Sequence, residues 1–94
     1  MPRIKVKGPK KDHEVLVYAL STCGWCKKTK QFLNNNGIEY EYVDFDLASP
    51  EERQSIIDEL TSNNIHLAFP ITIINDQTMI RGYNPDKFSE ELGL

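Results

Sequence analysis

Cysteine is scarce in this chain of 94 residues, which carries only two. They stand at Cys23 and Cys26, so a bridge between them would close a very small loop and would constrain the unfolded chain little. The sequence therefore does not fit the small secreted proteins that depend on several disulfides for their fold.

Long apolar runs are also absent. No segment approaches the roughly 20 apolar residues that a membrane helix needs. Residues 1–13 are basic, where the apolar part of a signal peptide would stand. We accordingly expect no membrane contact and a location in the reducing cytoplasm.

The side chains that would complete a metal site are missing too. A Cys-x-x-Cys pair can supply half of a zinc site, but the sequence has no second pair. His13 and His66 are far apart, and neither has another ligand at metal-binding spacing. We predict no metal site from these residues.

Charge is unevenly distributed along the chain. The formal net charge is −3, but residues 1–13 carry +4, which leaves −7 on the remainder. This basic arm contains no Phe, Tyr or Trp, so we predict no nucleic-acid site there. Residues 3–7 alternate charged and β-branched side chains until Gly8-Pro9 interrupts them. The arm is therefore either a solvated tail or an edge strand lying on the body.

Residues 14–94 predict one domain in which strands and helices alternate. The apolar segment Glu14–Leu20 is typical of a central strand, and Glu39–Asp46 of a second strand. Between them, the segment from Cys23 to about Gly37 has helical spacing and ends on a glycine that suits a helix stop. A strand, a helix and a strand in this order imply a parallel pair joined by a right-handed crossover.

The second half of the domain begins with the clearest helix signal. Ser49-Pro50-Glu51-Glu52 combines an N-cap, a first-turn proline and the acid of a capping box, and Ser62-Asn63-Asn64 ends the segment. Two short β-type runs, Ile71–Ile74 and Thr78–Arg81, predict an antiparallel hairpin. Asn84-Pro85 then begins a last helix.

The two cysteines stand where the first strand passes into the first helix, which suits reversible disulfide chemistry. Cys23 has the cap position, where free backbone N–H groups and the helix dipole favour a thiolate. Cys26 lies one turn further along, shielded but near enough to attack a mixed disulfide at Cys23. We predict both as catalytic residues of a dithiol cycle whose redox-active disulfide is Cys23–Cys26.

Several side chains near the cysteines predict a docking surface. Trp25 cannot easily reach the core without moving the cysteines, so we expect its ring to be exposed. Lys27 and Lys28 either add a positive potential that salt would screen or belong to a solvated helix face. Tyr18 and Phe32 are predicted core residues.

This order of elements, with Cys23-Gly24-Trp25-Cys26 at the first strand-to-helix junction, resembles the thioredoxin fold and, within it, the glutaredoxin family. The other landmarks are Pro70, which opens the hairpin, and Gly82, which follows it. The resemblance spans residues 14–92. It implies an α/β fold with a four-stranded mixed sheet, in the order β-α-β-α-β-β-α, and helices on both faces.

The resemblance also implies a substrate site. Pro70 would be a cis-proline facing the cysteines, preceded by Ala68-Phe69 where glutaredoxins commonly have Thr-Val. Tyr83 would line the groove or simply cover the last helix. The implied substrate-binding residues come from both sides of the site: Gly24, Trp25, Lys27, Phe69, Pro70, Gly82 and Tyr83.

The resemblance leaves two electron donors open. Glutaredoxins that use glutathione usually carry a basic residue shortly before the first cysteine and a Gly-Gly turn followed by acids. Here Ser21-Thr22 precedes Cys23, and one glycine and one late acid remain of the turn. The Gly82–Lys87 pattern is similar instead to the NrdH-redoxins, glutaredoxin-like hydrogen donors of ribonucleotide reductase that thioredoxin-reductase-type enzymes reduce.

The resulting hypothesis is a protein-disulfide reductase that receives its electrons from such an upstream reductase, with glutathione as the alternative donor. Ribonucleotide reductase is one candidate substrate. We expect a monomer with no tightly bound cofactor. Two other classes stay open. Some glutaredoxins resemble carriers that bridge an iron-sulfur cluster between two subunits through the first cysteine. A noncatalytic interaction module is the third class, which the retention of both cysteines disfavours.

Overall fold

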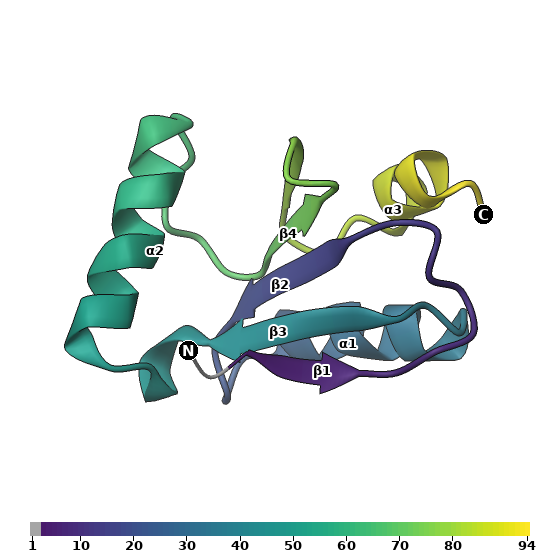
Figure 1. Ribbon diagram of the computed structural model, residues 1–94, viewed down its shortest axis with the longest axis horizontal. Helices are drawn as coiled ribbons and strands as arrows, with labels where there is room; N and C mark the ends of the chain where they lie inside the picture. Colours follow the sequence, from purple (N-terminus) through teal and green to yellow (C-terminus); the bar gives the residue numbers. More distant parts are fainter. Residues whose placement is uncertain (1–2) are drawn as a thin grey trace.

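The computed structural model describes residues 3–94, which form a five-stranded mixed sheet flanked by three α-helices (Figure 1). Within those residues, no helix has both the length and the apolar character that a membrane crossing requires. In chain order the elements are β1 (Ile4–Val6), β2 (Val15–Ala19), α1 (Gly24–Asn35), β3 (Tyr40–Asp44), the 3₁₀ helix η1 (Phe45–Leu47), α2 (Pro50–Ser62), β4 (Ile71–Ile74), β5 (Thr78–Arg81) and α3 (Pro85–Leu92).

β2 lies at the centre of the sheet, whose strand order is β1-β3-β2-β4-β5. It runs parallel to β3 and antiparallel to β4, and β4 runs antiparallel to β5. The parallel pair is connected through α1, as the sequence predicted. Every residue of β2 is buried, which explains why this strand is apolar throughout rather than alternating.

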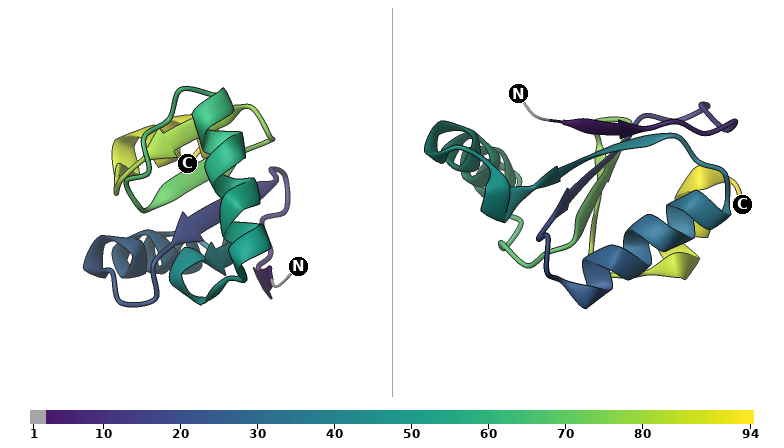
Figure 2. Two further views of the ribbon diagram at one scale, coloured as in Figure 1. Left: turned by 90° about the vertical axis from the view of Figure 1, so that its left-hand side faces the viewer. Right: turned by 90° about the horizontal axis from the view of Figure 1, so that it is seen from below.

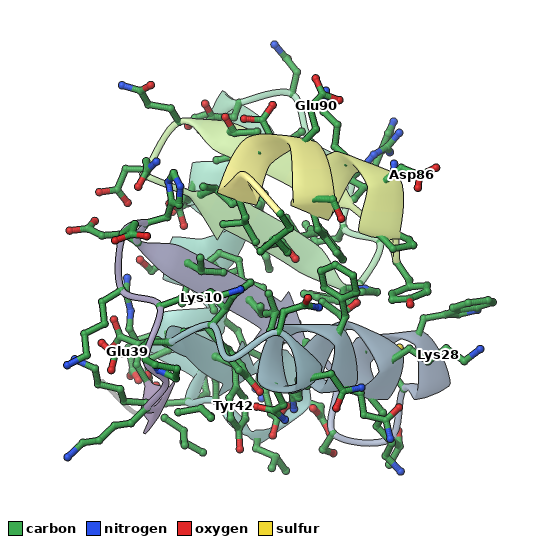
Figure 3. All side chains as sticks on the ribbon, turned by 90° about the vertical axis from the view of Figure 1, so that its right-hand side faces the viewer. Lys10, Lys28, Glu39, Tyr42, Asp86 and Glu90 are labelled. Carbon is green, nitrogen blue, oxygen red and sulfur yellow. The ribbon has the colours of Figure 1, made fainter. Side chains whose placement is uncertain are left out.

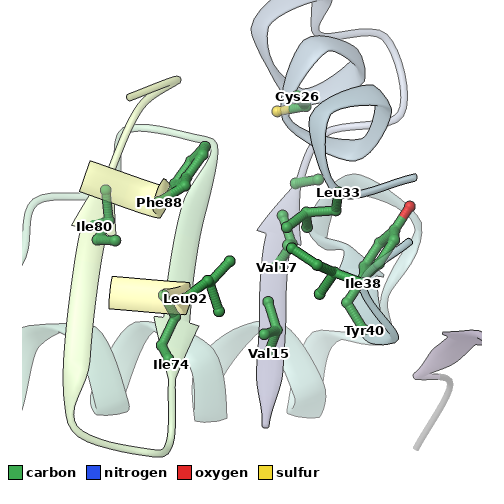
Figure 4. Close-up of a cluster of buried hydrophobic side chains, with 11 residues drawn as sticks. Val15, Val17, Cys26, Leu33, Ile38, Tyr40, Ile74, Ile80, Phe88 and Leu92 are labelled. Carbon is green, nitrogen blue, oxygen red and sulfur yellow. The ribbon is translucent and has the colours of Figure 1, made fainter. Parts of the chain in front are cut away.

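Helices cover both faces of the sheet, with α2 on one side and α1 and α3 on the other (Figure 2). Because side chains alternate along a strand, β2 contributes to two cores. Val17 belongs to the cluster beneath α1 and α3, whereas Leu16 and Tyr18 belong to the cluster beneath α2. Figure 4 shows the first cluster, in which Cys26 lies at one end beyond Leu33.

The prediction of four strands is wrong, because the basic arm contributes a fifth. β1 pairs antiparallel with β3, so that Ile4 lies opposite Tyr42. Lys5 forms an ion pair with Glu39, the residue before β3, at 3.6 Å. Of the two alternatives for the arm, the edge strand is therefore the one observed, and β1 forms it. The first two residues of the arm lie outside the described residues.

The helix starts are predicted correctly because their caps are encoded locally. Ser49 Oγ accepts the N–H of Glu52, and the Glu52 carboxylate accepts the N–H of Ser49, which completes the capping box of α2. Asn84 caps α3 through the N–H of Lys87. The predicted strand bounds are too wide: β2 is one residue shorter at each end than Glu14–Leu20. β3 begins at Tyr40 instead of Glu39 and ends at Asp44 instead of Asp46, because the chain turns into η1 there.

Candidate active site

Cys23 is the N-cap residue of α1. Its Sγ accepts the backbone N–H of Cys26 at 3.2 Å, so the sulfur takes the place of a capping oxygen. The positive end of the helix dipole lies at this same position, and it favours negative charge on the sulfur. Cys23 is half-buried, which leaves it within reach of a partner.

Cys26 lies one turn further into α1 and has no exposed surface. Its Sγ accepts the N–H of Leu20 at 3.4 Å. Burial, followed by the hydrogen bond with Cys23, raises the pKa of the Cys26 thiol to about 12. Both cysteines are free thiols in this structure, and they differ sharply in exposure.

A groove lies beside the cysteine-bearing end of α1. The peptide bond between Phe69 and Pro70 is cis, and the carbonyl of Pro70 accepts the N–H of Gly82 at 2.7 Å. Gly82 has a φ of 76°, a left-handed backbone that favours glycine. Together with Trp25 and Tyr83, these residues line a groove of about 220 Å³. The structure thus brings together five of the predicted substrate-binding residues.

Three aromatic side chains are among those that line this groove. Trp25 is 59% exposed, as predicted, and its ring stacks on Tyr83 with centroids 6.0 Å apart. Tyr83 in turn meets Phe88 of α3 edge-on at 6.3 Å. Both alternatives for Tyr83 therefore hold, since it lines the groove and contacts the last helix. On the other side, Phe69 packs against Phe45 at 5.0 Å.

The remaining predicted site residues lie outside the lining of the groove. Gly24 and Lys27 are exposed on the first turn of α1, next to the cysteines in sequence. Their part in substrate binding stays a prediction. Lys28 lies with its Nζ 5.0 Å from the centroid of the Trp25 ring, a cation–π contact at the rim. Tyr18 is buried as predicted, and Phe32 is half-buried against the core.

Two polar contacts near the site escape prediction from the sequence. The Asp46 carboxylate accepts both the hydroxyl and the N–H of Ser21, which ties the loop before Cys23 to η1. The hydroxyl, and then the N–H, lower the pKa of Asp46 below its ordinary value. Lys30 pairs with Asp44 at 3.2 Å in a half-buried position. Because each contact joins distant parts of the chain, no local motif signals it.

Other hollows are chemically different from this groove. At the start of β2 and β3, charged side chains of both signs line a space of about 370 Å³ that includes neither cysteine. Among residues 3–94, no three His, Cys, Asp or Glu side chains gather into a group that could hold a metal ion.

A thioredoxin-like sheet with a Cys-x-x-Cys pair at the start of its first long helix, and a cis-proline just before β4, defines a class of dithiol proteins. A family model described as Glutaredoxin matches residues 15–79, and the chain belongs to the glutaredoxin family.

Solved structures agree with this assignment. The chain is similar to the glutaredoxin from Methanosarcina mazei Go1, with 35% identity, a TM-score of 0.86, and coverage of 98% of this chain and 88% of that one. Methanoredoxin of Methanosarcina acetivorans is 39% identical with a TM-score of 0.85, covering 93% and 90% of the two chains. The glutaredoxin-like protein NrdH-redoxin from Escherichia coli shares the fold at 21% identity and a TM-score of 0.63, covering 82% and 92%.

Proposed function

We propose that this protein reduces disulfides in other proteins by a dithiol cycle. The Cys23 thiolate attacks one sulfur of the substrate disulfide, and the other substrate sulfur leaves as a thiolate. Cys26 then attacks Cys23 Sγ, which releases the second substrate thiol and forms the Cys23–Cys26 disulfide. Two electrons pass to the substrate, and an upstream reductase returns two electrons and two protons to the protein.

The contrast between the two thiols carries this proposal. Cys23 is accessible and its sulfur accepts the backbone N–H of Cys26, whereas Cys26 is fully buried and its pKa is raised. Part of that rise comes from Cys23 itself, through its hydrogen bond and its charge. A mixed disulfide at Cys23 removes the charge of that thiolate, so the resolving thiol becomes easier to deprotonate after the first attack.

The donor we propose is an enzyme of the thioredoxin-reductase type. The segment Gly82–Lys87 carries the pattern that resembles NrdH-redoxins, and ribonucleotide reductase is accordingly one candidate substrate. The groove supports a protein partner, because it is open and lined by the exposed Trp25 together with Tyr83 and Phe69. Large aromatic side chains of this kind commonly supply the energetic centre of a protein interface.

Reduction of insulin tests the activity. With a chemical thiol as electron source, the wild-type protein should accelerate the precipitation of reduced insulin chains, and Cys23→Ser should lose this acceleration. If Cys23→Ser retained wild-type activity, the proposed cycle would be wrong.

The donor is tested by two parallel assays. The oxidised protein is offered to glutathione with glutathione reductase, and separately to a thioredoxin reductase, each with consumption of NADPH as the readout. We expect faster reduction by thioredoxin reductase. Reduction by glutathione at a comparable or faster rate would overturn the proposed donor while leaving the dithiol cycle intact.

A further inference from the structure

A second hollow adjoins the groove at Tyr83. It has a volume of about 320 Å³ and runs along α1, away from the cysteines. Figure 3 shows this side of the molecule, with Lys28 projecting from the cysteine-bearing end of α1. We call this space the α1 hollow, and its lining residues are Lys28, Gln31, Phe32, Asn35, Asn36 and Tyr83.

The α1 hollow combines an aromatic floor with a polar and positive rim. Phe32 packs against Phe88 of α3 at a centroid distance of 5.5 Å, so the floor is fixed to the core. The rim carries three amide side chains, and Lys28 is its one charged lining residue. These groups suit a polar, negatively charged occupant better than an apolar one.

The α1 helix as a whole is positively charged, like the rim of the hollow. The helix carries three lysines and no acidic residue, although the whole chain has a net charge of −3. Lys30 is engaged by Asp44, whereas Lys27 and Lys28 are exposed, Lys28 with its Nζ over the Trp25 ring. The helix dipole adds positive potential near Cys23. The charged side chains that α1 places next to the reacting sulfur are therefore all positive on an acidic protein, while the Asp46 carboxylate in the same region is bound to Ser21.

The offset of Lys28 from Cys23 along the helix axis indicates where the occupant would sit in a substrate. Lys28 follows Cys23 by five residues, or about 7.5 Å along the helix axis at 1.5 Å per residue. An extended segment advances about 3.3 Å per residue, so it covers this distance in two to three residues.

We propose that the α1 hollow binds an acidic side chain two or three residues from the reacting cysteine in an extended segment of the protein substrate. This inference rests on the proposed function and adds a substrate preference to it. The rival occupant is a basic segment, because α3 carries Asp86 and Glu90 on the same side of the molecule (Figure 3). Neither acid lines the α1 hollow, which is why we favour the acidic occupant.

Short peptides with one cysteine test the preference. The cysteine is held in a disulfide with a coloured aromatic thiol, and Glu, Gln or Lys stands two or three residues before or after it. Cys23 attacks the peptide sulfur and the aromatic thiolate leaves, since the more acidic thiol leaves faster. Cys26 then releases the peptide thiol and forms the Cys23–Cys26 disulfide, so each turnover transfers two electrons. Release of the coloured thiol gives the rate.

When the variable residue stands on one of the two sides of the cysteine, we expect the Glu peptide to react about two- to fivefold faster than the matching Gln peptide at low salt. This ratio corresponds to the energy of an exposed ion pair. The preference should shrink as salt is added. Lys28→Glu should abolish or reverse it. Lys7→Glu makes the same charge change at an exposed position in the N-terminal segment and should leave it intact.

The possible failures are distinguishable. Equal rates for Glu and Gln at every position, a faster Lys peptide, or a Glu preference that survives Lys28→Glu would each overturn the acidic subsite while leaving the proposed reductase in place. A wild-type protein that releases no coloured thiol from any peptide would overturn the proposed function and this inference with it.

Discussion

At the scale of the residue, two chemically identical side chains have different surroundings, from which we propose different roles for them. Cys23 caps a helix and is reachable, and Cys26 is buried at one end of the cluster that includes Leu33 and Val17 (Figure 4). A thiolate is the reacting form, so the environment that stabilises or suppresses negative charge decides which sulfur reacts first.

Alkylation of the reduced protein checks this difference. Near neutral pH, iodoacetamide should modify Cys23 faster than Cys26 by at least roughly tenfold, because the buried thiol stays protonated. The rate at Cys26 should keep rising above pH 9, where an ordinary cysteine has largely titrated, because burial has raised its pKa to about 12. Mass spectrometry of digested protein identifies the modified residue, and preferential labelling of Cys26 would contradict the assignment.

Much of the site could be predicted at this scale because its signals are local. Two cysteines three positions apart, followed by a helix, predict a reactive pair, and an aromatic ring inside the Cys23–Cys26 turn can hardly be buried. The partners of Asp46 and Lys30 could not be predicted in this way. They are set by where η1 and β3 end in space, which no spacing in the sequence encodes.

At the scale of the element, the helix caps make separable contributions to stability. Ser49→Ala removes the side-chain half of the capping box of α2, and we expect a loss of about 1 kcal/mol in the free energy of unfolding. Ser55→Ala is the matched control, since Ser55 is exposed within the same helix and should change stability by only a few tenths of a kcal/mol. Urea unfolding measures both, and equal effects would exclude a special role for the cap.

The loop before Cys23 depends on a contact with η1. Asp46→Ala removes the acceptor for both Ser21 donors, so the Ser21 amide should exchange with deuterium faster. Cys26 should be alkylated several-fold faster, because its sulfur accepts the N–H of the neighbouring Leu20. Asp58→Ala removes only a contact within α2 and is the control. Unchanged exchange in Asp46→Ala would show that the loop is held by other means.

This contact also has a predicted pH dependence. The pKa of Asp46 is lowered in the folded protein, so its contribution to stability is complete above the ordinary carboxyl pKa and is lost as the pH falls through the lower value. In wild-type protein, the Ser21 amide should therefore lose protection in acid relative to its intrinsic rate, and Asp46→Ala should lack this step. A step of the same size in Asp46→Ala would assign it to another group.

At the scale of the whole molecule, the N-terminal arm is held on the body in two ways. β1 pairs with β3, and Gly8 packs closely against the backbone of residues 37–39. A Cβ at Gly8 would lie 2.7 Å from the Gly37 carbonyl oxygen and 2.9 Å from the Glu39 nitrogen. Gly8→Ala should accordingly destabilise the protein by about 1–3 kcal/mol. A Cβ at Gly24 meets nothing within 4 Å, so Gly24→Ala should stay within about 0.5 kcal/mol. Thermal unfolding measures the stability of both variants, and a Gly8→Ala variant as stable as the wild-type protein would contradict the close packing.

The layers of the fold could be predicted from the sequence, but the number of strands in the sheet could not. Alternating strands and helices with strong caps imply the parallel pair, the hairpin and the three helices. β1 has only three residues, none of them fully buried, and its one charged side chain, Lys5, suits solvent equally well. Its place is decided by the free edge of β3, which only the assembled sheet provides.

The most direct test of the dithiol cycle is to trap its intermediate. Cys26→Ser, mixed with a protein disulfide and then digested, should retain the substrate through a disulfide on Cys23, because the resolving thiol is gone. Wild-type protein should show little of this adduct and should accumulate the Cys23–Cys26 disulfide. If Cys26→Ser turned over substrate at the wild-type rate without an adduct on Cys23, the account of attack and resolution would be contradicted.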